Sequence, residues 1–210
     1  MKYIIPVIVV LLLSASVSFA ESKIDGKSLN NANVQQSMNM ALGKGATSNT
    51  ASTKMKNSEV GKGGMVSNKA VIQKSMNMAL GEGATANTGS ITMKDSEVGK
   101  GGMVSNKAVI QKSMNMALGK GATANMGSVT MDGSKVQGKV LNNANVKQSM
   151  NMTLGKGATA NTGSVTIKNS EVGKGGIVSN KAVIQKSMNM ALGQGATANM
   201  GSVTMDGSKV

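Results

Sequence analysis

The feature that constrains this chain most is a long internal repeat. The tetrapeptide Ser-Met-Asn-Met returns at a nearly constant spacing of 38 residues, with one spacing of 36. Its copies begin at Ser37, Ser75, Ser113, Ser149 and Ser187. A unit that recurs at a fixed spacing of this length favours a fold in which each unit stacks on the one before it.

An asparagine divides each unit in two, because it recurs every 19 residues apart from a single two-residue deletion. The ten positions are Asn30, Asn49, Asn68, Asn87, Asn106, Asn125, Asn142, Asn161, Asn180 and Asn199. Two residues after each asparagine stands alanine or glycine, and four residues after it stands a β-branched residue. Alternate residues of a strand share a face, so we interpret these two positions as the inward face of a strand.

Glycine-rich segments such as "GKGAT" and "GKGGMVS" end the 19-residue units, and glycine reaches the positive φ values that sharp corners need. The sequence therefore predicts an all-β fold, a β-solenoid of about ten 19-residue coils paired as 38-residue repeats over residues 30–210. Coils built on "SMNMALG" would alternate with coils built on "GSVTMKDSEV"-like segments. At roughly 4.8 Å per coil the rod would be about 50 Å long. The ten asparagines would stack into an amide ladder, as in cross-β structures.

The first twenty residues are typical of a secretory signal peptide. Lys2 gives a positive start, residues 4–13 are apolar, and Ser18-Phe19-Ala20 matches a small-x-small cleavage site. Residues 21–29 would form a short lead-in before the solenoid. We expect an exported protein, extracellular or on the cell surface, with a periplasmic location left open.

Removal of the leader would leave no aromatic residue, proline, cysteine, histidine or arginine. Without His or Cys, catalysis would need a carboxylate pair, a lysine nucleophile or a metal site. The acids Glu59, Glu97 and Glu171 recur as copies of one repeat position, which indicates surface charge rather than a convergent cluster. The sequence therefore predicts no enzyme, no cofactor and no small-molecule substrate.

The charge balance is strongly basic. The whole chain has 23 Lys+Arg against 9 Asp+Glu, so losing Lys2 leaves 22 − 9 = +13. A surface of this kind favours polyanions such as acidic polysaccharide or extracellular DNA, although it serves solubility equally well. Lys69, Lys107 and Lys181 occupy equivalent repeat positions and are the candidate contacts, binding phosphate backbones without reading sequence.

The Met-Asn-Met pairs have two interpretations. Exported Met-x-Met pairs offer thioether sulfurs to Cu(I), and methionine is also a flexible filler of narrow interiors. The ten residues are Met38, Met40, Met76, Met78, Met114, Met116, Met150, Met152, Met188 and Met190. We favour packing and predict no metal, since Met93, Met131 and Met205 share a repeat position with Ile167, which cannot bind a metal.

The segments "NNANVQQS" from Asn30 and "NNANVKQS" from Asn142 resemble the Asn/Gln-bearing repeats of the curlin family of functional amyloids. The run "NVQQSMNMALG" is similar to the repeats of Fap fimbrial amyloids. Lys74, Lys112 and Lys186 stand where the resemblance calls for glutamine, and the aromatic residues of curlin repeats are missing. The resemblance implies secretion as an unfolded chain and self-assembly into biofilm-matrix fibres.

We therefore expect a secreted structural subunit that polymerises end to end with itself. The sequence supports this expectation because neither end shows a segment that would cap a solenoid, and the last unit stops part of the way through at Val210. Two alternatives stay open. One is a monomeric basic adhesin that binds polyanions, and the other is a methionine-rich periplasmic Cu(I)-binding protein.

Overall fold

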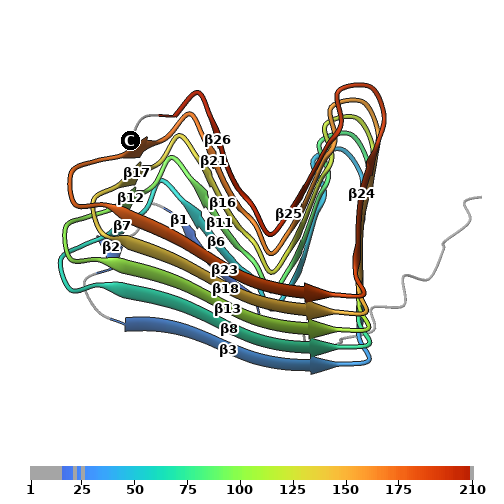
Figure 1. Ribbon diagram of the computed structural model, residues 1–210, viewed down its shortest axis with the longest axis horizontal. Coiled ribbons are helices and arrows are strands. Elements are labelled where there is room, and N and C mark those ends of the chain that lie inside the picture. Colours follow the sequence, from blue (N-terminus) through green and yellow to red (C-terminus); the bar gives the residue numbers. More distant parts are fainter. Residues whose placement is uncertain (1–15, 21–22, 25–26, 209–210) are drawn as a thin grey trace, which may run out of the picture.

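A computed structural model describes residues 16–20, 23–24 and 27–208, and within them every regular element is a β-strand. The strands stack in parallel into a β-solenoid of about 5 turns (Figure 1), which confirms the predicted fold class. Strand partners are 38 residues apart, as in the pairing of Asn68 with Asn106. The coil is therefore the whole 38-residue unit, and the prediction of ten 19-residue coils is wrong. At roughly 4.8 Å per coil, five coils rise about 24 Å rather than 50 Å.

Each coil contributes one strand to each of sheets I, II and III, in that order along the chain. Sheet I contains β3 (Lys27–Gln35), β8 (Met65–Gln73), β13 (Met103–Gln111), β18 (Lys139–Lys147) and β23 (Ile177–Gln185). Sheet II contains β4 (Met38–Leu42), β9 (Met76–Leu80), β14 (Met114–Leu118), β19 (Met150–Leu154) and β24 (Met188–Leu192). Sheet III contains β5 (Thr47–Thr50), β10 (Thr85–Thr88), β15 (Thr123–Met126), β20 (Thr159–Thr162) and β25 (Thr197–Met200).

Two further sheets complete the coil. Sheet IV contains β1 (Val17–Ala20), β6 (Thr53–Lys56), β11 (Ile91–Lys94), β16 (Val129–Asp132), β21 (Val165–Lys168) and β26 (Val203–Asp206). Sheet V contains β2 (Lys23–Ile24), β7 (Glu59–Val60), β12 (Glu97–Val98), β17 (Lys135–Val136) and β22 (Glu171–Val172). We number the coils 1 to 5 from β3, β8, β13, β18 and β23.

The outline of a coil is uneven (Figure 1). Sheet I forms the lower side, sheet II turns upward at its end, and sheet III returns beside sheet II to make a narrow limb. The chain then reverses between sheets III and IV, so that this bend points down towards sheet I. Hence the two 19-residue halves of a unit are opposite walls of one coil rather than successive coils.

The same turn conformation forms three corners of each coil. A residue with φ near +50° precedes a serine, as at Lys74-Ser75 and Asp95-Ser96. The serine hydroxyl donates to the backbone carbonyl two residues earlier, from Ser75 to Gln73 at 3.1 Å and from Ser96 to Lys94 at 2.8 Å. Repeated serine therefore marks a corner, because its hydroxyl closes a local hydrogen bond to the backbone across the turn.

The bend between sheets III and IV explains the small residues of the second half-unit. Gly89 has φ +59°, and a Cβ there would lie 3.2 Å from the Cβ of Ala108 on sheet I. The small residue two positions after each asparagine was predicted to face inward from a strand. This is correct for Ala70 and Ala108 in sheet I, but in the second half-unit the small residue forms a corner. The positive φ and the close side chains of sheet I, rather than strand alternation, favour glycine or alanine there.

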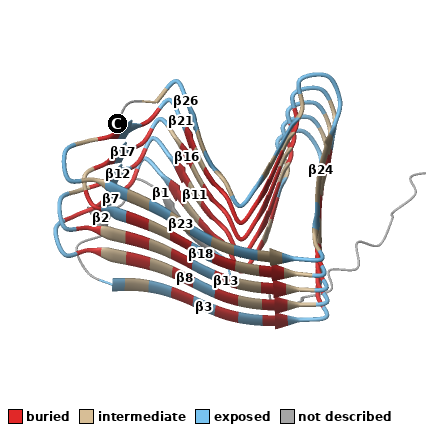
Figure 2. Cartoon of the chain, in the orientation of Figure 1, coloured by how far each residue is buried: buried red, intermediate tan, exposed pale blue. Residues whose placement is uncertain are grey.

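The buried residues, red in Figure 2, include three clusters of apolar side chains. Sheets I, IV and V enclose Val, Ile and Met side chains such as Ile91 and Met93, which are fully buried. The bend packs on Ala and β-branched residues of sheet I, including Ile72 and Ile110. The third cluster, between sheets II and III, consists of alanines, for example Ala79 and Ala86. Because the limb is narrow, it excludes large side chains.

The two-residue deletion and the N-terminal boundaries fit this plan. The deletion shortens the turn between β17 and β18, which leaves the register of coil 4 on coil 3 unchanged. At the N-terminus, β1 pairs with β6, although residues 17–20 were predicted to belong to the leader. β3 begins at Lys27, inside the predicted lead-in of residues 21–29. The apolar segment 4–13 lies outside the described residues.

Candidate functional site

The Met-Asn-Met segments form the strands of sheet II, and their methionines point outward. In β9 the burial alternates, with Asn77 and Ala79 buried and Met76, Met78 and Leu80 partly exposed. The prediction that the two methionines share a face opposite the asparagine is confirmed. The interpretation that these pairs fill the interior is wrong. It holds only for the other methionine column, where Met93 and Met131 are 0% exposed and Ile167 is 1% exposed.

Asparagine replaces methionine inside the limb because the limb is narrow and its backbone needs partners. The side-chain amide of Asn115 donates to the backbone carbonyls of Ala86 and Asn125 on sheet III, both at 3.1 Å. It also donates to Asn151 of the next coil at 2.9 Å and accepts a hydrogen bond from the hydroxyl of Thr88 at 3.0 Å. A buried amide with all its groups paired is stable, whereas a methionine here would clash with sheet III.

We call the outward surface of sheet II the methionine face. It consists of three unbroken columns, because the strands pair in register. The columns are Met38, Met76, Met114, Met150, Met188; Met40, Met78, Met116, Met152, Met190; and Leu42, Leu80, Leu118, Leu154, Leu192. Every outward side chain of sheet II is therefore apolar.

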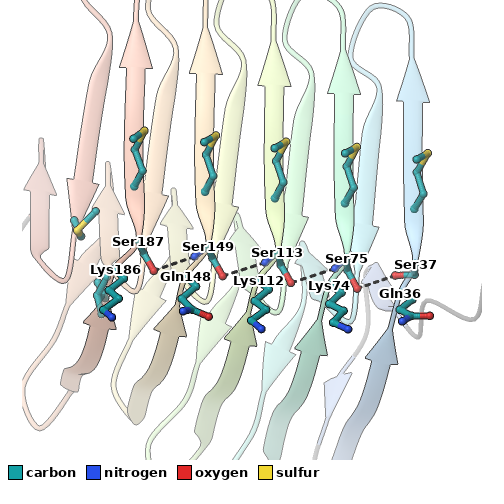
Figure 3. A pocket seen from close by; sticks show the side chains of 17 residues that line it. Gln36, Ser37, Lys74, Ser75, Lys112, Ser113, Gln148, Ser149, Lys186 and Ser187 are labelled. Carbon is teal, nitrogen blue, oxygen red and sulfur yellow. Dashed lines mark hydrogen bonds between the residues drawn. The ribbon is translucent and has the colours of Figure 1, made fainter.

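A groove of about 1120 Å³ runs along the corner between sheets I and II. One wall is the corner row, consisting of Gln36, Lys74, Lys112, Gln148 and Lys186. The first methionine column lines the other side, and the serines of the corner lie between them (Figure 3). The groove also reaches Ile184 and Met200 of coil 5. It thus places ammonium groups beside thioether side chains in coils 2, 3 and 5, and glutamine amides beside them in coils 1 and 4.

The repeated asparagines form two ladders of five rather than one of ten, because successive half-units face each other across the coil. In the ladder of sheet I, each side chain donates to the next coil, from Asn30 through Asn68, Asn106 and Asn142 to Asn180, at 2.8–2.9 Å. In the ladder of sheet III, each donates to the previous coil, from Asn199 through Asn161, Asn125 and Asn87 to Asn49, at 2.9–3.0 Å.

A third ladder, in sheet II, was not predicted. It runs from Asn77 through Asn115 and Asn151 to Asn189, with hydrogen bonds of 2.9–3.0 Å. The sequence signal was present, since an asparagine stands between the two methionines in every unit and a small residue follows two positions later. It was missed because the apolar methionines were assigned to the interior.

The structure brings the candidate polyanion contacts into one column on the outer side of sheet I. Lys107 pairs with Lys69 on one side and with Asn143 on the other, and Asn143 pairs with Lys181. All three lysines are exposed. Lys69 and Lys107 are therefore one strand apart, while Lys181 is separated from Lys107 by an uncharged residue.

The acids form part of a mixed column. In sheet V, Glu97 pairs with Glu59 on one side and with Lys135 on the other, and Lys135 pairs with Glu171. Among the described residues, no three His, Cys, Asp or Glu side chains gather as a metal site. In the same residues no helix is long and apolar enough to cross a membrane.

Comparison with known protein families, with curated proteins and with solved structures found no match.

Proposed function

We propose that this chain is an exported structural subunit that stacks end to end into extracellular fibres. The observation that carries the proposal is that the amide ladders finish with complementary groups at the two ends of the solenoid. Asn180 accepts from Asn142 and has no further coil above it in the described residues. Asn30 donates to Asn68, so its side-chain oxygen faces the opposite end.

Placing β23 of one copy against β3 of the next would continue the ladder. The amide of Asn180 would donate to the oxygen of Asn30, as Asn142 donates to Asn180 within the chain. The ladder of sheet III runs the opposite way, so Asn49 would donate across the same junction to Asn199. Only a head-to-tail arrangement satisfies both ladders, and such a heterologous contact propagates as a filament.

Within the described residues, apolar interior side chains of coil 5 are exposed. Val203 and Met205 of coil 5 are 50% and 42% exposed, while the equivalent Ile91 and Met93 of coil 2 are 0% exposed. Unpaired strand edges together with an open apolar interior favour addition of another strand layer. The interior side chains that a following copy would cover are the same types that cover each other within the chain.

At the other end, β1 lies on β6 in the layer that β26 of a preceding copy would occupy. If the leader is removed after Ala20, as the sequence predicts, this edge of β6 becomes available. β2 would remain in the same layer as part of sheet V. It would not compete with a preceding copy there, because the described part of coil 5 contributes no strand to sheet V. Processing at Ala20 would therefore prepare the N-terminal end for stacking.

The test uses purified mature protein and one pair of matched variants. The protein is expected to form thioflavin-positive fibres with a reflection near 4.8 Å. Met205→Lys would place a charge inside the junction and should stop elongation, while the folded monomer tolerates it because Met205 is exposed there. Thr204→Lys is the control, since Lys54 already occupies that outward column. A mature chain that stays monomeric for days at high concentration, or equal inhibition by both variants, contradicts the proposal.

A monomeric rod that binds polyanions is the second candidate, supported by the lysine column of sheet I. Affinity for DNA or acidic glycan that falls steeply with salt, measured on a chain that does not polymerise, would favour it. Replacing Lys69, Lys107 and Lys181 with asparagine should then reduce that salt dependence.

A further inference from the structure

The methionine face is an apolar surface that the rest of the described coil leaves uncovered. Leu42, Met38 and Met40 at its N-terminal edge are 67%, 53% and 49% exposed. Other outward surfaces are mixed or polar. The outer side of sheet I carries lysine and asparagine columns, such as the one that includes Lys107 and Asn143. A contiguous exposed apolar patch with a polar border is a candidate interaction site.

Lysines border this face on both sides. On one side lies the corner row, in which Lys74, Lys112 and Lys186 are exposed. On the other side lies the turn row, which consists of Lys44, Glu82, Lys120, Lys156 and Gln194. Six lysines and one glutamate give the two rows a net charge of 6 − 1 = +5. The glutamate, Glu82, lies 4.0 Å from Lys44 at the surface.

A second copy of the chain does not suit this face. Five strands and five residues per strand cover roughly 20 by 16 Å, or about 300 Å². A stable protein interface buries about 800 Å² on each partner. Laying two methionine faces together would also oppose lysine rows to lysine rows at both borders, since each face carries them on both sides. Both size and charge therefore favour an anionic partner with an extended surface.

We infer that the methionine face docks on the surface of an anionic phospholipid bilayer. Flat contact brings the Met and Leu columns to the boundary of the acyl chains and both lysine rows to the level of the phosphates. Long lysine stems lie along apolar surface while their ammonium groups stay in water, which suits the border of such a face.

The corner groove has a shape and chemistry that suit a single anionic phospholipid molecule. Its ammonium wall, formed by Lys74, Lys112 and Lys186, can receive phosphate oxygens. Its methionine wall can receive the first part of an acyl chain, and methionine adapts to irregular apolar partners. The inference does not rest on fibre formation, because one subunit presents the whole face; stacking would only extend it.

The experiment is vesicle flotation with gel-filtered monomer, using phosphatidylcholine vesicles with and without phosphatidylglycerol. We expect binding to the anionic vesicles. The triple variant Lys74→Gln, Lys112→Gln, Lys186→Gln should weaken it on the order of 100-fold, since each lysine near an anionic surface contributes about fivefold. Glutamine fits this corner because Gln36 and Gln148 adopt the same φ of 50°.

The matched control removes three charges elsewhere. Lys69→Asn, Lys107→Asn, Lys181→Asn acts on the outer side of sheet I, where Asn143 already occupies the column. This control should retain nearly all binding. Equal losses from the two triple variants would mean diffuse attraction to positive charge and would overturn the inference.

A second variant tests the apolar columns. Met76→Thr, Met78→Thr, Met114→Thr, Met116→Thr keeps strand-forming residues and should reduce binding about tenfold or more, with an unchanged circular dichroism spectrum. Undiminished binding would leave only a polyanion contact. Absence of vesicle binding, with loss of lateral association in the threonine variant, would identify the face as a contact between copies. The Met205→Lys variant is designed to block stacking. If its monomer still binds vesicles, membrane binding does not depend on fibre formation.

Discussion

Methionine occurs in two settings in this protein, and the two settings differ in what they tolerate. In sheet IV the column of Met55, Met93 and Met131 is fully buried, and Ile167 replaces methionine in coil 4. In the first two columns of the methionine face all ten positions are methionine, and all ten side chains are at least partly exposed. The buried column therefore accepts isoleucine, an apolar side chain of similar volume, in place of methionine. The exposed columns keep methionine where packing does not demand it, which is consistent with a role at the surface.

The largest difference between the two settings should appear on truncation. Met131→Ala should lower the free energy of unfolding by about 2–5 kcal/mol, because it removes a fully buried side chain and leaves a cavity. Met116→Ala removes the same atoms from an outward position and should cost about 1 kcal/mol or less. Urea denaturation of dilute monomer, followed by circular dichroism, measures both. Equal losses would contradict the outward orientation of the methionine face.

The asparagine between the methionines should matter more than either neighbour. Asn115→Ala removes a buried amide that donates to Ala86, Asn125 and Asn151, and it also removes the oxygen that accepts from Asn77 and Thr88. We expect a loss of about 2–4 kcal/mol in the same denaturation experiment. Asn143→Ala, on the exposed side of sheet I, is the control and should change stability by less than about 0.5 kcal/mol. A neutral Asn115→Ala would show that the ladder of sheet II adds nothing.

A smaller effect is expected from exchange inside the buried column. Met131→Ile should cost less than about 1.5 kcal/mol, since the substitution roughly conserves volume and coil 4 already has isoleucine at this site. Thermal unfolding with matched scans of the parent and the variant would measure it. A loss as large as that of Met131→Ala would show that coil 3 packs its methionine in a way that coil 4 does not share.

The sequence predicts the fold class because the repeat, the β-branched residues and the glycine corners agree with one another. It also shows that Met76 and Met78 share a face opposite Asn77, since strand alternation requires it. It does not show which face is inside. The usual rule places apolar residues inward, but the limb is too narrow for methionine and its backbone carbonyls need the amide of Asn77.

The length of the coil was predicted wrongly for a similar reason. Asn30 and Asn49 start half-units that look alike over four residues, yet the second half-unit bends at Ala51 and again at Asn57, both with positive φ. The first half-unit has one such corner, at Gln36, and a longer strand. Two unlike walls cannot stack on each other, so the true period is the full unit. The serine after each corner residue is a signal that could have revealed this.

The last test leaves the fold nearly unchanged and compares the oxidation rates of the buried and exposed methionines. Brief treatment with dilute peroxide converts accessible methionine to the sulfoxide, and the rate depends on access of the oxidant to sulfur. Met38, Met40 and Met188 are 53%, 49% and 48% exposed, whereas Met55, Met93 and Met131 are 0% exposed. Peptide mass spectrometry should therefore find the first group oxidised at least about tenfold faster than the second. Met205, 42% exposed in the monomer, sharpens the comparison, because stacking would cover it while the methionine face stays open. Its protection in fibres, with Met38 and Met188 still reactive, would support the end-to-end junction and the free face together. Uniform oxidation of all these methionines in the folded monomer would contradict the division between the two settings.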